Sequence, residues 1–143
     1  MKKILYIFLS CTLLIACDLE IPDNGNLDGN WQLRQIDTLA TNGRCDMTYS
    51  YVYWGIENQL LQVRDIDNNN LRIFFRFKRE SNELTIHSPY RVITKDELTP
   101  VEDTEILLPI GITGTEDHFI IENLSSSSMI LKNVDYRLHF RKY

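Results

Sequence analysis

Apolar and polar residues alternate along much of this chain, which is the pattern of β-strands with one buried face. From Leu71 to Lys78 every odd position is apolar, and the even positions are basic except for Phe74. The same alternation runs through Tyr136–Arg141 and through the residues around Trp31. Each of these segments predicts a strand that turns one face to a core.

Shorter segments of the same kind add further candidate strands. They are Val52–Ile56, Leu60–Asp65, Leu84–His87, Phe119–Leu124 and Met129–Lys132. Turn-forming residues such as Asp67–Asn70 and Asn133–Asp135 separate them. Short strands joined by tight polar turns predict an all-β antiparallel meander, and closure into a barrel would hide the edges of such a sheet.

The region near residues 94–112 departs from this alternation. Thr94 and Glu97 have the spacing of a helix cap, but Pro100 would end such a helix early. We therefore expect a short helical or irregular segment here. The apolar residues that follow, Ile106–Ile112, have two interpretations. They form either a plug that fills one end of the barrel or a mobile lid whose Ile106, Leu108 and Ile110 contact a bound ligand.

The N-terminus has the organisation of a secretion signal. Lys2 and Lys3 precede the apolar stretch Ile4–Ile15, whose 12 residues are too few to span a bilayer core of roughly 30 Å as a helix. A small residue, Ala16, then precedes Cys17. This ending resembles the lipobox of bacterial lipoproteins. The resemblance implies that Cys17 becomes the first mature residue and carries acyl chains such as palmitate.

Processing at this position divides the chain into three parts. We expect a signal peptide at residues 1–16, a flexible tether at residues 17–26 and one β-domain at residues 27–143. The lipid would hold the domain at the cell envelope, on the outer membrane. Acidic residues follow Cys17 directly, which resembles the export tag of surface lipoproteins; the alternative is an acidic spacer facing the periplasm.

Charge content limits the class of binding partner, and cysteine content limits how the fold can be stabilised. The chain has 15 basic and 20 acidic residues, and its formal net charge is −5. This balance argues against a nucleic acid partner. Cys45 is the only cysteine of the sequence after Cys17, so the mature chain can form no internal disulfide and must rely on core packing.

Signals for catalysis or metal binding are weak. The sequence contains no Gly-x-Ser-x-Gly, glycine-rich phosphate loop or His-Glu-x-x-His motif. Asp65-x-Asp67-x-Asn69 has the spacing of the start of a calcium loop, but Asn70 stands where the glycine is required. We therefore expect a hairpin turn there, and neither an enzyme, a cofactor nor a metal site.

Three tyrosines at alternate positions are the clearest candidate for binding. Tyr49, Tyr51 and Tyr53 would share one face of a strand, opposite Val52 and Trp54. Inside a barrel they would grip an amphipathic ligand through their apolar rings and polar tips. On the outer wall they would stack on a partner or a sugar, or form ordinary sheet surface.

The first and last strands resemble those of a known family. Gly29-Asn30-Trp31 is similar to the Gly-x-Trp opening of lipocalins and of lipocalin-like lipoproteins of Bacteroides-type bacteria, and residues 129–142 resemble their closing hairpin. The resemblance implies an up-and-down barrel of about eight strands. It also implies that a basic residue near the C-terminus packs on Trp31 to seal the barrel. Arg141 matches that residue by position, although its alternation with Phe140 points it outward.

Two functions follow from these observations. One is a membrane-anchored barrel that binds a small hydrophobic or amphipathic ligand, or an envelope protein. The other is a filled barrel without a ligand lumen, acting through its loops as an interaction or inhibitor protein. The bulky residues at inward positions favour a small or absent lumen.

Overall fold

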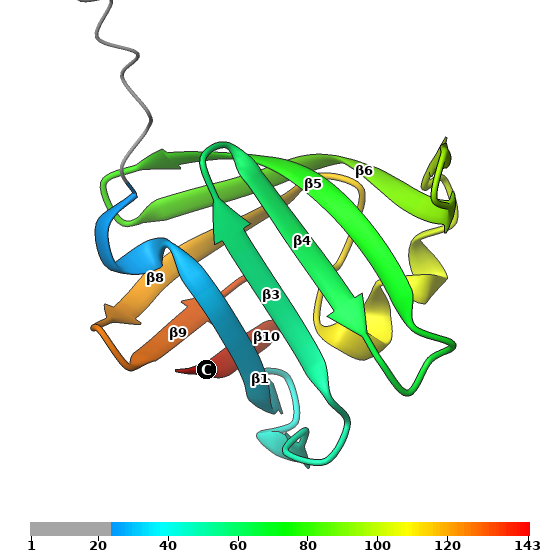
Figure 1. The fold of residues 1–143 in the computed structure, drawn as a ribbon. Coiled ribbons are helices and arrows are strands. Elements are labelled where there is room, and N and C mark those ends of the chain that lie inside the picture. The colour runs from blue at the N-terminus through cyan, green and yellow to red at the C-terminus, as the bar shows by residue number, and fades with distance from the viewer. Residues whose placement is uncertain (1–23) are drawn as a thin grey trace, which may run out of the picture.

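The computed structural model describes residues 24–143, which form an antiparallel β-barrel (Figure 1). In chain order the elements are η2 (Gly25–Leu27), β1 (Gly29–Thr38), β2 (Gly43–Asp46), β3 (Val52–Glu57), β4 (Leu60–Asp65), β5 (Leu71–Glu80), β6 (Glu83–Thr94), β7 (Glu97–Pro100), η3 (Thr104–Ile106), η4 (Leu108–Ile110), β8 (Asp117–Leu124), β9 (Ser128–Lys132) and β10 (Tyr136–Lys142). The η elements are short 3-10 helices.

Eight of these strands close the barrel. The pairing order is β1, β3, β4, β5, β6, β8, β9 and β10, and the ring closes where β10 pairs with β1. Closure gives each of these strands a partner on both sides and removes the exposed edges of an open sheet. The predicted all-β, eight-stranded antiparallel barrel is confirmed.

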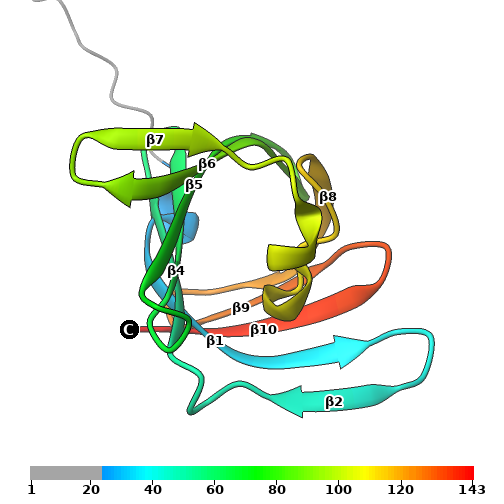
Figure 2. The same cartoon turned by 90° about the vertical axis from the view of Figure 1, so that its right-hand side faces the viewer.

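The other two strands extend hairpins beyond the ring (Figure 2). The first half of β1 pairs with β3, and its second half, from Gln35 to Thr38, pairs with β2. In the same way β6 pairs first with β8 and then, from Tyr90 onward, with β7. The segment near residues 94–112, predicted to be helical or irregular, therefore begins with the β6–β7 hairpin. Its short helical turns begin only at Thr104.

Side chains of the inward positions pack the interior. Trp31, Trp54, Phe75 and Phe119 are among the largest fully buried residues. The ring of Trp54 packs against Phe140 and Phe119, with centroids 4.8 and 5.9 Å away. Tilted and edge-to-face contacts of this kind add to the stabilisation that comes from burial alone. The barrel therefore has a filled core, as the bulky residues at the inward positions of the strands predict.

Short helical turns close both ends of this core. At one end η2 places Leu27 in the core, and Trp31 Nε1 donates to its carbonyl oxygen at 2.9 Å. At the far end of β1, the η3–η4 segment buries Leu107, Ile110 and Ile112. The burial of these three side chains supports the plug interpretation of the apolar segment.

Gly111 lets the chain turn at the end of this plug. Its φ of 81° lies in the left-handed region, and it caps η4. A Cβ atom at this position would also collide with the side chain of Leu138. Glycine avoids both the strain and the collision, so the plug can rest directly on β10.

Candidate functional site

The predicted tyrosine stripe lies outside the barrel. Tyr49 is 78% exposed in the turn before β3, and Tyr51 is 43% exposed with a left-handed φ of 51°. Tyr53 is on β3 itself but faces outward, because Val52, Trp54 and Ile56 occupy the inward positions. The expectation that these tyrosines line a lumen is therefore corrected. Of the three, Tyr53 packs edge-on against Tyr143, with ring centroids 5.6 Å apart.

The expected lid residues do not share one face. Ile110 is 1% exposed, Ile106 is half-buried and Leu108 is 43% exposed. The segment folds as two successive 3-10 turns, and these place Leu107 inside instead of Leu108. These residues cap the core and do not line a common ligand surface.

Lys142, and not Arg141, covers Trp31. The Nζ atom of Lys142 lies 4.7 Å from the centroid of the Trp31 ring and donates to the Asn26 carbonyl oxygen at 3.0 Å. Arg141 is exposed on the outer wall, as its alternation with Phe140 indicates. A cation above an indole ring is favourable. Strand alternation is the sequence signal that identifies Lys142, because Lys142 is two residues after Phe140 and shares its inward side of β10.

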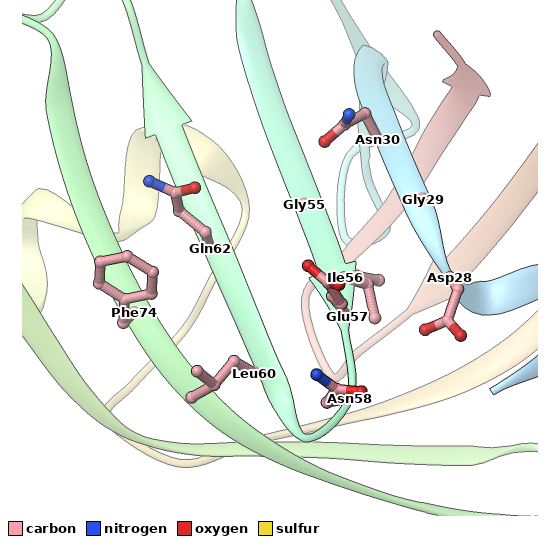
Figure 3. Close-up of a pocket in the computed structure, with 10 residues that line it drawn as sticks. All are labelled: Asp28, Gly29, Asn30, Gly55, Ile56, Glu57, Asn58, Leu60, Gln62 and Phe74. Carbon is pink, nitrogen blue, oxygen red and sulfur yellow. The ribbon is translucent and has the colours of Figure 1, made fainter. Parts of the chain in front are cut away.

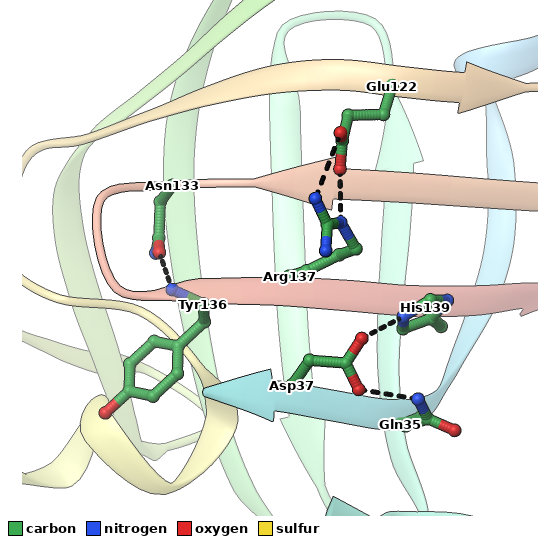
Figure 4. A network of polar contacts seen from close by, with 7 residues as sticks. All are labelled: Gln35, Asp37, Glu122, Asn133, Tyr136, Arg137 and His139. Atoms are coloured by element: carbon green, nitrogen blue, oxygen red, sulfur yellow. Dashed lines mark hydrogen bonds and ion pairs between the residues drawn. The ribbon is translucent and has the colours of Figure 1, made fainter. Parts of the chain in front are cut away.

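A buried polar cluster holds the plug in place. Asn133 Nδ2 donates to the Gly111 carbonyl oxygen and to Asp117 Oδ2, both at 2.9 Å. The backbone N–H of Thr113 donates to the same Asp117 oxygen at 2.9 Å. Asn133 Oδ1 accepts from the Tyr136 N–H at 2.7 Å (Figure 4). These contacts join the segment after η4, the start of β8 and the β9–β10 turn, so they have a structural role.

One hydrogen bond and one ion pair stabilise the neighbouring wall (Figure 4). His139 Nε2 lies 2.7 Å from Asp37 Oδ2 and joins β10 to β1, and Arg137 Nε donates to Glu122 Oε1 at 2.6 Å across β9. Burial raises the pKa of Asp37, but hydrogen bonds from His139 and Gln35 outweigh it and hold that pKa below its ordinary value. The hydrogen bond from Arg137 lowers the pKa of Glu122.

Concave surface suited to a ligand lies on the outer wall of the barrel. Three adjoining pockets of about 330, 530 and 590 Å³ follow the outside of β1, β3, β4, β5 and β6. The first two share Asn30, Gly55 and Gln62, and the last two share Leu60 and Phe74. We call this continuous depression, drawn in part in Figure 3, the Gly55 groove.

Strand register aligns the floor of the Gly55 groove. Asn30 of β1 pairs with Gly55 of β3, Gly55 with Gln62 of β4, Gln62 with Phe74 of β5, and Phe74 with Tyr90 of β6. At about 4.8 Å between neighbouring strands, the four steps from Asn30 to Tyr90 span about 19 Å. Residues far apart in the sequence therefore form one row, which follows the curvature of the barrel wall.

The absence of a side chain at Gly55 makes the wall concave there. A Cβ atom at this position would lie 3.2 Å from Asn30 Oδ1, so the adjacent amide crowds the space above the glycine. Larger side chains rise on both sides, with Tyr53 and Tyr143 at one end and Tyr90 and Leu98 at the other. Within residues 24–143, the amides of Asn30 and Gln62 make no side-chain hydrogen bond, so their donors and acceptors are available.

Other chemistries have little support in the part of the chain that the structure describes. No group of three or more His, Cys, Asp or Glu residues there is placed to hold a metal ion. Cys45 is exposed, and its Sγ lies 3.7 Å from Met47 Sδ. Between residues 24 and 143, no helix is long and apolar enough to cross a membrane. Cys17 and the signal peptide lie outside the described residues.

Comparison with known proteins agrees with the barrel. A lipocalin-like protein from Bacteroides uniformis superposes with a TM-score of 0.64 at 21% identity, covering 83% of this chain and 100% of the other. An uncharacterized protein from Bacteroides eggerthii superposes with a TM-score of 0.53 at 17% identity, covering 81% of this chain and 98% of the other. The search of curated proteins gave no match. The family model described as a lipocalin-like domain matches residues 11–143, and the chain therefore belongs to the lipocalin-like domain family.

Proposed function

We propose that this protein is a lipid-anchored envelope protein that binds through the outer wall of a filled barrel. The observation that carries the proposal is the contrast between the two sides of the wall. The inward side is packed with Trp31, Trp54, Phe75 and Phe119, whereas the outward side carries the Gly55 groove. This favours the filled-barrel alternative, with the binding surface on the wall and not on the loops.

The proposed role is binding without catalysis. The groove is lined by side-chain amides, aromatic rings, aliphatic side chains and four charged residues, Asp28, Glu57, Arg64 and Arg76, and the histidines of the described residues are outside its lining. A filled barrel is also a stiff support, because each strand of the ring is hydrogen-bonded on both sides and its inward side chains are close-packed. A surface that is already formed loses little conformational freedom on binding.

Anchoring is the second part of the proposal. The lipobox-like Leu14–Cys17 and the acidic residues after it support a lipid on Cys17, attachment to the outer membrane and exposure at the cell surface. Two or more acyl chains give stable attachment, whereas one chain gives only reversible binding. The anchor would keep the groove within a tether's length of the membrane.

Site-specific photo-crosslinking in intact cells tests binding at the groove. A photoreactive benzoylphenylalanine replaces Leu60, which lines the groove and is 45% exposed, or Ile120, which is 47% exposed on β8 away from the groove. We expect a discrete adduct from position 60 and none from position 120. Introducing Gly55→Phe into the same chain should abolish the adduct by filling the groove.

Two outcomes would refute binding at the groove. One is the same adducts from positions 60 and 120, which would indicate random collision. The other is an adduct from position 60 that survives Gly55→Phe in a chain whose thermal unfolding shows that it remains folded. The experiment thus separates a binding site from an exposed apolar position.

A further inference from the structure

We infer that the Gly55 groove binds a neutral oligosaccharide, an inference that rests on the proposed outer-wall function and names its ligand class. A sugar ring presents apolar C–H faces and a rim of uncharged hydroxyl groups. Its binding site therefore needs aromatic rings for the faces and groups that both donate and accept hydrogen bonds for the rim. The groove offers both kinds of group in one row across the sheet.

Aromatic residues stand at both ends of the row. Tyr53 and Tyr143 pack on each other at the β1–β3 end. Phe74 and Tyr90 are direct cross-strand neighbours on β5 and β6. Tyr143 is 85% exposed and Tyr90 is 42% exposed, so their rings are accessible from solvent. Tyrosine suits such a surface because its ring is apolar and its hydroxyl can remain hydrated.

Two uncharged amides lie between these aromatic ends. Asn30 and Gln62 flank Gly55 in register, one on each neighbouring strand. Each amide supplies a carbonyl acceptor and an NH₂ donor, which matches a pair of neighbouring sugar hydroxyls. The glycine between them carries no side chain, so the Asn30 amide is the nearest group above the backbone of β3 and is placed to contact a bound ring (Figure 3).

The charges around the row favour an uncharged ligand. Asn30, Gly55, Gln62, Phe74 and Tyr90 carry no charge. The carboxylate of Asp28 at the border accepts hydrogen bonds from Asn24, and the guanidinium of Arg64 donates to Asn70 Oδ1 at 2.9 Å. Glu57 and Arg76 also line the groove, so two acidic and two basic side chains border the row and their charges balance. On a chain with a net charge of −5, an anionic polymer therefore gains little attraction.

Two other ligand classes fit this wall less well. A peptide that binds by adding a strand needs a free sheet edge, whereas β3, β4 and β5 are each paired on both sides. A purely apolar ligand would cover the amides of Asn30 and Gln62 without replacing their hydrogen bonds to water, which is unfavourable. The span of about 19 Å from the strand spacing is longer than one sugar ring, so we assign an oligosaccharide.

Direct titration of the full-length protein in detergent micelles tests the inference. The probes are neutral hexasaccharides of glucose (α- and β-linked), xylose and mannose, with hexagalacturonate as the anionic comparison, each followed by isothermal titration calorimetry. We expect at least one neutral hexasaccharide to bind and hexagalacturonate not to bind. Gln62→Ala and Phe74→Ala should each weaken that binding at least tenfold, whereas Ile120→Ala should leave it unchanged.

The results distinguish the oligosaccharide inference from the proposed outer-wall binding on which it rests. Binding of hexagalacturonate alone, binding that Gln62→Ala and Phe74→Ala leave unchanged in folded protein, or no binding by any probe would overturn the oligosaccharide assignment. If that happens while position 60 still gives its groove-dependent adduct, the groove binds another class of ligand. If both experiments fail, the outer wall is not the binding surface.

Discussion

Leu107 and Leu108 are adjacent in the sequence but have opposite environments. Leu107 is fully buried in the plug, and Leu108 is 43% exposed at the start of η4. Their side chains are chemically identical, so the difference in burial alone determines what each contributes. This pair makes the role of the plug testable at single residues.

Replacing each leucine by alanine should give very different results. Leu107→Ala should lower the free energy of unfolding by about 2–5 kcal/mol, because it removes buried methyl groups and leaves a cavity. Leu108→Ala should change it by less than about 0.5 kcal/mol, as is usual at exposed positions. Urea denaturation measures both. Equal effects would contradict the plug and favour a mobile segment.

Cys17 is the residue on which attachment depends. Cys17→Ala should abolish incorporation of labelled palmitate and prevent cleavage by the lipoprotein peptidase, because the acylated thiol is missing. Cys45→Ala is the matched control and should label as the natural protein does, since its thiol lies on β2 of the folded domain. Labelling of the Cys17→Ala protein would show that the lipobox interpretation is wrong.

At the scale of elements, the β1–β10 pairing closes the barrel, and Asp37 and His139 join these two strands. The folded protein holds the pKa of Asp37 below its ordinary value. The carboxylate therefore stabilises the fold above the unfolded pKa of about 3.9, and this contribution is lost as the pH falls through the lower folded pKa.

Asp37→Asn should reveal this pH dependence. At pH 7 the variant should be less stable than the natural protein by about 1 kcal/mol, which allows for solvent screening at a partly exposed pair. The difference should shrink as the pH falls from about 4 towards 2, where Asp37 itself becomes protonated. Urea denaturation at several pH values checks it. A penalty that is the same at pH 7 and pH 2 would show that the charge has no role.

At the scale of the whole molecule, the anchor and the barrel together determine what the groove can reach. If the protein faces outward, protease added to intact cells should remove the domain, while a periplasmic protein in the same cells stays intact. Full protection of the domain, with a known surface protein digested in parallel, would place it on the periplasmic side. The acidic residues after Cys17 are the basis of this expectation.

Local patterns were sufficient to predict the eight strands of the ring and the barrel, but they did not predict β2 or β7. A strand's side chains alternate between its faces whatever its partners are, so Leu71–Lys78 and Tyr136–Arg141 predict both the strands and their buried sides. The same rule points Arg141 outward. The lipocalin-like resemblance, carried by Gly29-Asn30-Trp31 and the closing hairpin, agrees with the family match.

Only the tertiary structure decided which surface is concave. Asn30, Gly55, Gln62, Phe74 and Tyr90 come from five strands, and their alignment depends on the register of four strand pairings. No local period encodes that register, because each pairing joins residues distant in the chain. The plug is similar: Ile106–Ile112 has no alternation, and contact with Leu138 and the Asn133 cluster selects Leu107 for burial. Local sequence thus determined the faces of the strands, and long-range packing determined the groove.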